Sequence, residues 1–582
     1  MDLRRGLSAT IAAVVAVVAP VVPAPSAVAQ DSGVPGSTAP RIDVSDQLPD
    51  RPGGFSIGAR EAIRIANRDA KVDETRERYA RLDASAEAEE PNTWQVGYFA
   101  DDREVAQVLV DATAATVRES WTGDQVAWQM ARGYEGSFGH TLNAPYVWLP
   151  LCAIFLLGLL DWRRPWRLVH LDLVVLLSFG VSHVFFNRGE IGLSVPLVYP
   201  VLAYLLARLA WIGLRGRGPG LSPSAPVVWL AVAAAFLVGF RIALNIADSG
   251  VIDVGYSGVI GADRVLGGEP LYGDGAFPED NPFGDTYGPV NYYAYVPFEL
   301  ALPWSGEWDE LAAGHAAAIL FDLAVVAMLV AVGRRLRPGR RGRDLGVVLA
   351  FAWVAYPYTD YALQSNANDS LVAALVLAAL LLLSSPPGRG AMTALAALTK
   401  FAPLALAPLF VAGPRAGLAS RDPNTGRGPL DRRRVRAVAV FALAFVGIVA
   451  LALLPVVLDP GIATMWEQTI EQQVGRESPF SIWGQEPGLE PLRVGLMIAT
   501  AAFALAAAFV PRRRSPERSA ALAAAILVAL QLTAEHWFYL YIVWFLPGLL
   551  IALTASGRRR DPVAARGPKT TDARRVAGVG AS

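Results

Sequence analysis

Long apolar segments recur along most of this chain, and they constrain its fold more than any other feature. Several exceed the ~18 residues that a helix needs to cross a bilayer, a length that soluble cores rarely require. Hydrophobic residues make up 53% of the 582 residues and charged residues only 18%, whereas about 25% of a soluble chain is charged. The sequence therefore predicts a mainly α-helical, polytopic integral membrane protein with about eleven transmembrane helices, near residues 147–161, 168–186, 192–213, 226–246, 311–333, 345–358, 369–384, 437–457, 491–510, 519–534 and 538–554.

Charge and cysteine content exclude several kinds of site. The formal net charge of −1 provides no overall positive field for nucleic acid. The single cysteine, Cys152, rules out an internal disulfide and a cysteine-rich metal site. We expect no cofactor. Neither an EF-hand spacing nor a histidine-pair motif indicates a metal site, and a bound divalent cation is the alternative. The oxygen ligands that a hard cation would otherwise find are Asp248, Asp253, Asp263, Asp274, Asp280 and Asp285.

The N-terminus has the organisation of a secretory signal peptide. Arg4 and Arg5 precede an apolar stretch, and Ala27-Val28-Ala29 fits the small-residue rule for cleavage. We therefore predict a signal peptide over residues 1–29, which places the next segment of the chain outside the cytoplasm. An uncleaved first helix is the alternative. Residues 30–54, rich in Pro, Gly, Ser and Asp, are a predicted linker.

Residues 55–140 are predicted to form a small extracytoplasmic α+β domain. The stretch "IGAREAIRIANRDA" has helical spacing, and "TWQVGYFA" and "VAQVLVDA" alternate as strands do, with Asp101 and Asp102 as the turn. In this order the unit resembles the PepSY-type extracytoplasmic domain. An unclassified α+β module is the alternative.

Basic loops orient the predicted helices, because cytoplasmic loops collect Lys and Arg. With residues 31–146 outside, alternation places the basic loops inside only if segment 391–412 begins and ends on the cytoplasmic side. These loops are 161–167, 215–218, 333–343, 415–436, 511–518 and 557–560. We expect a multi-pass protein of the cell membrane, with residues 556–582 as a disordered cytoplasmic tail.

Segment 391–412 has Lys400 at its centre and Pro403 just after it. A charge at the bilayer centre costs roughly 2.5–3.5 kcal/mol and usually faces protein or a water-filled cavity, and proline interrupts a helix. We therefore predict a re-entrant helical hairpin that directs Lys400 into an internal cavity. A single span with a snorkelling lysine is the alternative, but it would place the arginine-rich 415–436 loop outside.

The loops assigned to the outer side combine aromatic residues with amides and acids. Aromatic residues are ordinary at membrane interfaces, but a belt of aromatic residues does not explain the Asp, Asn, Gln, His and Glu clustered with them. Sugar rings stack on aromatic faces, and their hydroxyls need paired donors and acceptors. The pattern therefore indicates a carbohydrate site, formed by loops 247–310, 356–369, 465–484 and 535–541.

Four segments in a fixed order carry a family resemblance: "IDVGYSGVIGADRVLGGEPLYG" (252–273), "YGPVNYYAYVPFELALPW" (287–304), "QSNANDSLVAALVLAALL" (364–381) and "ALTKFAPLALAPLF" (397–410). With them, the chain resembles the C-type glycosyltransferase superfamily, specifically family 87, the polyprenyl-phosphate-mannose-dependent mannosyltransferases. The resemblance implies a membrane core over 226–555. It also implies transfer of a hexose, mannose in that family, from a polyprenyl-phosphate donor to a cell-envelope glycolipid or polysaccharide acceptor on the extracytoplasmic face. The family usually places its aspartate after the first span, so residues 146–215 are an additional three-helix module.

The resemblance assigns the general base to Asp253, in "DVGY" ahead of "GGEPLYG". Such a base accepts the acceptor hydroxyl proton, and a phosphate leaves without a general acid, so we expect a one-step inverting displacement. Asp248 is the rival base. Lys400 matches the family's lysine and would meet the lipid phosphate. The other predicted donor- or substrate-binding residues are Tyr256, Tyr287, Gln364, Asn366, Asn368, Asp369, Arg476 and His536; an ordinary helix cap is the alternative for Asp369.

Two other functions fit part of these patterns. A broken helix with an intramembrane lysine also suits a transporter or flippase of a lipid-linked substrate, although the two halves share no evident internal repeat. A non-catalytic envelope sensor or assembly protein would act through the outer domain instead. Sugar transfer that depends on Asp253 would separate the enzyme from both.

Overall fold

The computed structural model describes residues 54–89, 92–101, 103–136, 140–216, 218–273, 275–278, 281, 283–306, 311–413, 432–471, 478–511 and 514–555. The predicted signal peptide, most of the linker, the C-terminal tail and Arg476 lie outside the described residues. Within these ranges the chain is mainly helical, with an antiparallel sheet near its N-terminal side.

The sheet belongs to a small α+β unit in the N-terminal part of the chain. Two helices, α2 (Ala59–Ala66) and α3 (Ala70–Arg78), precede strands that pair in chain order, and α2 packs on Trp94 and Val96 of the second strand. Both strand predictions are confirmed, and Asp101 has the left-handed φ of 54° that the turn needs. The relation to PepSY-type domains stays a prediction. The strands are β1 (Asp83–Glu89), β2 (Thr93–Ala100), β3 (Arg103–Asp111) and β4 (Thr116–Thr122).

Glu104, on β3, makes the stability of this sheet depend on pH. Burial raises the pKa of its carboxyl from 4.5 to about 7, against smaller opposing effects of Gln107 and Arg132. The folded state therefore binds the proton more tightly than the unfolded state. Protonation of Glu104 thus stabilises the fold at low pH, and this stabilisation is lost as pH rises from about 4.5 through 7. We expect Glu104→Gln to slow hydrogen exchange of the β3 amides about tenfold at pH 8 and hardly at pH 5.

Hydrogen–deuterium exchange of the whole protein, read by mass spectrometry on β2–β3 peptides, measures this effect. Glu77→Gln on the exposed face of α3 is the matched control and should leave exchange unchanged at both pH values. Equal protection of the Glu104→Gln variant and the native chain at pH 8 would contradict the assignment.

Within the described residues, six helical segments are long and apolar enough to cross a membrane. They are α8 (Leu168–Leu177) with α9 (Phe179–Phe186), α10 (Ile191–Arg215), α11 (Val227–Ala247), α14 (Ala312–Leu336), α20 (Arg432–Leu458) and η4 (Pro487–Leu489) with α24 (Glu490–Ala506). Shorter apolar segments are α7 (Pro145–Leu159), α17 (Asp369–Leu381), η2 (Ala402–Leu406) with α19 (Ala407–Ala412), and η5 (Tyr539–Tyr541) with α26 (Ile542–Leu553). The chain therefore has the helices of a membrane protein, while the expected total of about eleven spans stays a prediction.

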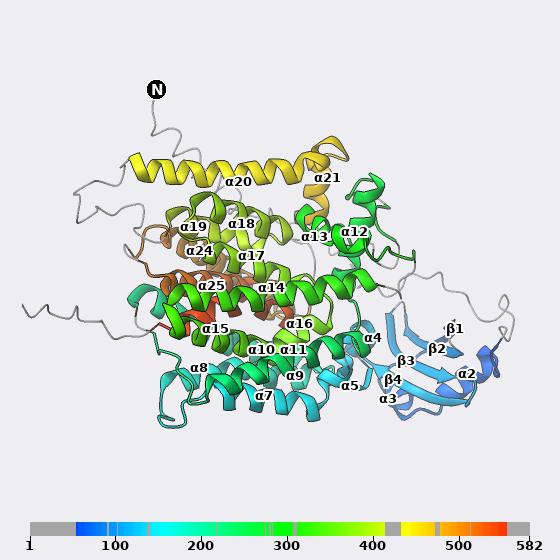
Figure 1. Cartoon of the computed structure of the whole chain (residues 1–582). Coiled ribbons are helices and arrows are strands. Elements are labelled where there is room, and N and C mark those ends of the chain that lie inside the picture. The colour runs from blue at the N-terminus through cyan, green and yellow to red at the C-terminus, as the bar shows by residue number, and fades with distance from the viewer. Residues whose placement is uncertain are drawn as a thin grey trace, which may run out of the picture.

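The long helices run roughly along one direction (Figure 1). The N-terminal α+β unit, α12 (Asp253–Gly267) and α13 (Pro289–Glu299) lie toward one end of this bundle. The alanine-rich α25 (Pro516–Thr533) is buried between α10, α24 and α26, because small side chains let helices approach closely. The remaining elements are α4 (Asp124–Ala127), η1 (Gln129–Arg132), α5 (Gly133–Gly136), α6 (His140–Asn143), α15 (Gly339–Val354), α16 (Pro357–Gln364), α18 (Pro386–Thr399), α21 (Ile462–Trp466), η3 (Glu467–Glu471) and α23 (Ile482–Gln485).

The segment predicted as a re-entrant hairpin is broken at Lys400. Helix α18 ends just before Lys400, whose backbone is extended (φ −137°, ψ 138°), and η2 and α19 follow. Near the start of α18, Arg389 donates hydrogen bonds to the carbonyls of Leu383 and Phe410. Because Phe410 lies in α19, the two ends of the segment meet, and the chain doubles back with Lys400 at the turn.

Candidate active site

Asp253 is the first residue of α12, and its side chain is exposed. The segment ahead of it is held by two backbone hydrogen bonds, in which the N–H groups of Gly250 and Ile252 donate to the carbonyls of Gln364 and Ser365 at 3.3 and 3.2 Å. These bonds fix where α12 begins. They leave an exposed carboxylate at a defined position, which is the requirement for a base that receives a proton from an incoming acceptor.

Asn366 supports the same junction. Its side-chain amide donates to Ser249 Oγ and to the Gly250 carbonyl, both at 3.0 Å, and its Oδ1 accepts from Asn245 Nδ2 at 2.8 Å. The residue is fully buried and has the left-handed φ of 50° that Asn tolerates. In this structure the amide that we predicted for sugar binding is thus bonded to the loop that carries Asp253.

Gly255 allows α12 to approach this loop. A Cβ at this position would lie well inside van der Waals contact with the Asn366 carbonyl oxygen. Gly255→Ala is expected to push the start of α12 away and to lower the predicted sugar transfer roughly thirtyfold, because small displacements of the predicted base are costly. Activity in membranes that contain equal amounts of protein measures the effect. Gly267→Ala, at the unobstructed end of the same helix, is the control; a full loss in both variants would point to misfolding.

Asp248 caps the end of α11 and serves a different neighbour. Its Oδ2 accepts the backbone N–H of Thr141 at 2.7 Å, which ties the segment between the N-terminal α+β unit and α7 to the end of α11. One carboxylate oxygen of the rival base is therefore occupied by this contact.

Lys400 lies in an aromatic enclosure at the end of α18. Its Nζ is 2.8 Å from Asp369 Oδ1, and only 11% of its side chain is exposed. The ammonium also lies 5.2–5.8 Å from the ring centroids of Trp544, Tyr541 and Tyr287, distances at which the ring faces attract a cation. The ammonium is thus held by one carboxylate and three π faces, and a lysine has three donors.

Tyr287 reaches Lys400 because the chain ahead of α13 passes very close to α18. A Cβ on Gly288 would overlap the Leu398 carbonyl oxygen, so only glycine permits this approach. The Tyr287 carbonyl accepts from the Tyr272 hydroxyl at 2.9 Å, which anchors the same turn. A predicted donor-binding residue is thereby brought next to Lys400.

Asp369, predicted as a donor- or substrate-binding residue, is the buried counter-ion of Lys400, a pairing that the sequence analysis did not predict. Its Oδ1 receives both Lys400 Nζ and Trp544 Nε1, the latter at 2.7 Å, and the residue is fully buried. Its Oδ2 has no hydrogen-bond partner among the described residues. The alternative role as a helix cap does not fit, because Asn368 is the N-cap of α17 and neither side chain caps that helix.

The amides beside this pair retain unused hydrogen-bonding capacity. Asn368 Nδ2 donates to Asn291 Oδ1 at 2.7 Å, and Gln364 Nε2 donates to Asp360 Oδ1 at the same distance. Asn368 Oδ1, Asn291 Nδ2 and Gln364 Oε1 are buried without a partner among the described residues. Buried polar atoms without partners are uncommon, so these atoms are candidates for contact with water or substrate.

Two other predicted residues lie in separate contacts. The buried ring of Tyr256 packs edge-on against Trp304, with centroids 6.0 Å apart. His536 Nδ1 lies 2.9 Å from Ser478 Oγ, and its ring packs against Phe480. Neither of these contacts involves the Lys400–Asp369 pair.

A second buried charge cluster was missed by the sequence analysis. Arg241 lies in α11, fully buried, with Nη2 2.9 Å from Asp322 Oδ1 and Nε 3.5 Å from Asp360 Oδ1. The guanidinium also donates to the Thr359 carbonyl, so it anchors α16, the helix that ends at Gln364. The available signal was a lone arginine inside an apolar run, since such a charge requires a partner within the protein.

The described residues contain no group of three His, Cys, Asp or Glu side chains placed to hold a metal ion. Asp274 and Asp280 lie outside the described residues.

Long apolar helices, a broken helix and buried ion pairs are the features of a membrane protein with a polar site. Residues 286–534, less than half of the chain, match the model of glycosyltransferase family 87. This match supports that family and indicates a membrane glycosyltransferase, which requires a sugar donor and an acceptor. It includes the predicted residues from Tyr287 through Lys400 and begins after Asp253. No curated protein matches the chain.

Proposed function

We propose that this protein transfers a hexose, mannose by its family resemblance, from a polyprenyl-phosphate donor to a cell-envelope glycolipid or polysaccharide. The reaction takes place on the extracytoplasmic face, with Asp253 as general base. The observation that carries the proposal is that one short segment, residues 364–369, contacts both predicted functional groups. Its first half fixes the start of α12 at Asp253, and its last residue, Asp369, pairs with Lys400.

The chemistry needs one base and one stabiliser of the leaving group. The Asp253 carboxylate accepts the proton of the acceptor hydroxyl as that oxygen forms a bond to the anomeric carbon. The bond from the anomeric carbon to the phosphate oxygen breaks, and the phosphate leaves with the electron pair. A single displacement inverts the anomeric configuration. The Lys400 ammonium, held by Asp369 and the aromatic rings, stabilises charge on the departing phosphate.

The pairing with Asp369 gives Lys400 a defined orientation before the donor arrives. A cation that is already desolvated and held in place acts more strongly on a developing charge than a mobile one in water. The amide atoms of Asn368, Asn291 and Gln364 that lack a partner among the described residues support recognition of sugar hydroxyls, which require both donors and acceptors.

The test is a transfer assay in membranes that contain the full-length protein. Polyprenyl-phosphate sugars with a labelled sugar are supplied, and label in acid-stable glycosidic linkage to envelope acceptors is measured with the anomeric configuration of the product. Transfer with inversion from the mannose donor supports the proposal. Labelled lipid that crosses the membrane without a new glycosidic bond would instead indicate a flippase. The absence of both sugar transfer and lipid translocation would indicate a non-catalytic envelope protein.

A further inference from the structure

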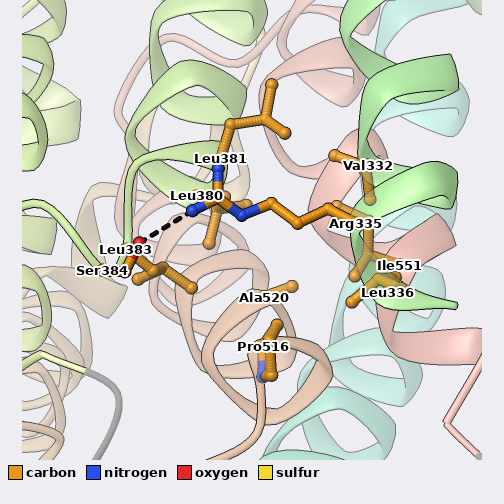
Figure 2. A pocket seen from close by; sticks show the side chains of 10 residues that line it. All are labelled: Val332, Arg335, Leu336, Leu380, Leu381, Leu383, Ser384, Pro516, Ala520 and Ile551. Atoms are coloured by element: carbon orange, nitrogen blue, oxygen red, sulfur yellow. Dashed lines mark hydrogen bonds between the residues drawn. The ribbon is translucent and has the colours of Figure 1, made fainter. Parts of the chain in front are cut away.

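A cavity of about 130 Å³ lies between the ends of four helices, away from the candidate active site. Its lining comes from α14, α17, α25 and α26 (Figure 2). Helix α17 begins at Asp369 and has 13 residues, so this end lies about 20 Å along α17 from the Lys400–Asp369 pair. The cavity therefore belongs to the opposite end of the bundle, where the sequence places its basic loops.

The side chain of Arg335 extends across this cavity from α14 toward the end of α17 (Figure 2). One Nη donates to Ser384 Oγ at 2.7 Å. Among the described residues, no carboxylate lies within ion-pair distance of this guanidinium, and a guanidinium has five donors in a planar fork. Most of its neighbours in the lining are apolar, including Leu336, Leu380 and Ile551.

Three nearby cations contact groups outside the cavity. Arg337 donates to the Thr554 carbonyl at the end of α26, and Arg518 to the carbonyls of Gly213 and Leu214. Arg340 pairs with Asp344 at 3.9 Å. Arg335 lines the leucine-walled hollow and has donors to spare beyond its bond to Ser384.

We infer that this cavity binds the headgroup phosphate of an anionic membrane phospholipid. The Arg335 fork takes the phosphate, and the apolar walls take the first carbons of an acyl chain. Basic pockets between transmembrane helices bind acidic lipid headgroups on this principle. A free phosphate would gain nothing from the leucine and isoleucine walls. The lipid would join the ends of α17 and α26, the two helices that carry Asp369 and Trp544.

The test uses delipidated full-length protein in a neutral detergent. Short-chain phosphatidylglycerol is titrated, with phosphatidylcholine of equal chain length and inorganic phosphate as the other probes, and the thermal midpoint is recorded. We expect phosphatidylglycerol alone to raise the midpoint. Arg335→Gln should weaken this response about fivefold, the effect of one interfacial arginine. Arg340→Gln, which removes an exposed arginine at the start of α15, should respond like the native chain.

A second variant keeps the Arg335 charge and fills the cavity with a larger side chain. Ala520→Leu places a larger side chain in the lining and should abolish the phosphatidylglycerol response while Arg335 remains. The inference is overturned if Arg335→Gln responds like the native protein, if phosphatidylcholine acts equally well, or if inorganic phosphate alone reproduces the shift. Bound lipid, extracted and identified by mass spectrometry, gives a readout independent of thermal stability.

Discussion

Asp253→Asn is expected to lower sugar transfer about a thousandfold while the protein still accumulates in the membrane. The amide cannot accept the acceptor proton, and general base catalysis typically contributes 10²–10⁴-fold. Asparagine is also well suited to the start of a helix, so α12 should keep its place against residues 364–366. The assay is transfer of labelled sugar in membranes with matched protein levels.

Two matched variants separate this role from a general loss of charge. Asp263→Asn removes an exposed acid from the same helix and should transfer at the native rate. Asp248→Asn retains an oxygen that can accept the Thr141 N–H, so we expect only a small effect. Native activity in Asp253→Asn together with inactivity in Asp248→Asn would assign the base to Asp248 instead.

Lys400→Met is expected to have two separable effects. Transfer should fall by about 10²–10³-fold, because a preorganised group that stabilises the departing phosphate is lost. The protein should also be destabilised by roughly 3–5 kcal/mol, because Asp369 is left buried without its cation. Thermal unfolding and transfer activity of the purified protein measure the two effects independently.

The double variant Lys400→Met/Asp369→Asn distinguishes catalysis from structure. Asp369→Asn removes the uncompensated charge, and its amide oxygen can still accept from Trp544, so we expect stability to return close to the native value. Transfer should stay as low as in Lys400→Met. A double variant that regains native activity would show that the ion pair is structural and that another group meets the phosphate.

Local features of the sequence carried the prediction of the membrane class and the broken helix. An apolar run of sufficient length forms a membrane helix in most contexts, and a lysine followed by a proline interrupts one, so both features are readable without tertiary information. The alternating strands β2 and β3 and the turn at Asp101 were equally local. The four segments that resemble family 87, taken in their order, identified the residues around Lys400. The family match covers these residues.

Only the tertiary structure decided which buried groups meet. Asp369 and Lys400 are 31 residues apart in the chain, Arg241 and Asp322 are 81 apart, and Asn366 reaches Ser249 across 117 residues. A charge or amide away from water must be compensated, so each of these residues needs a partner. The sequence alone offered several acids and amides for every such need. The packing of α11, α14, α16, α17 and α18 determines which of these acids and amides become partners, because side-chain contacts follow from helix placement and not from spacing along the chain.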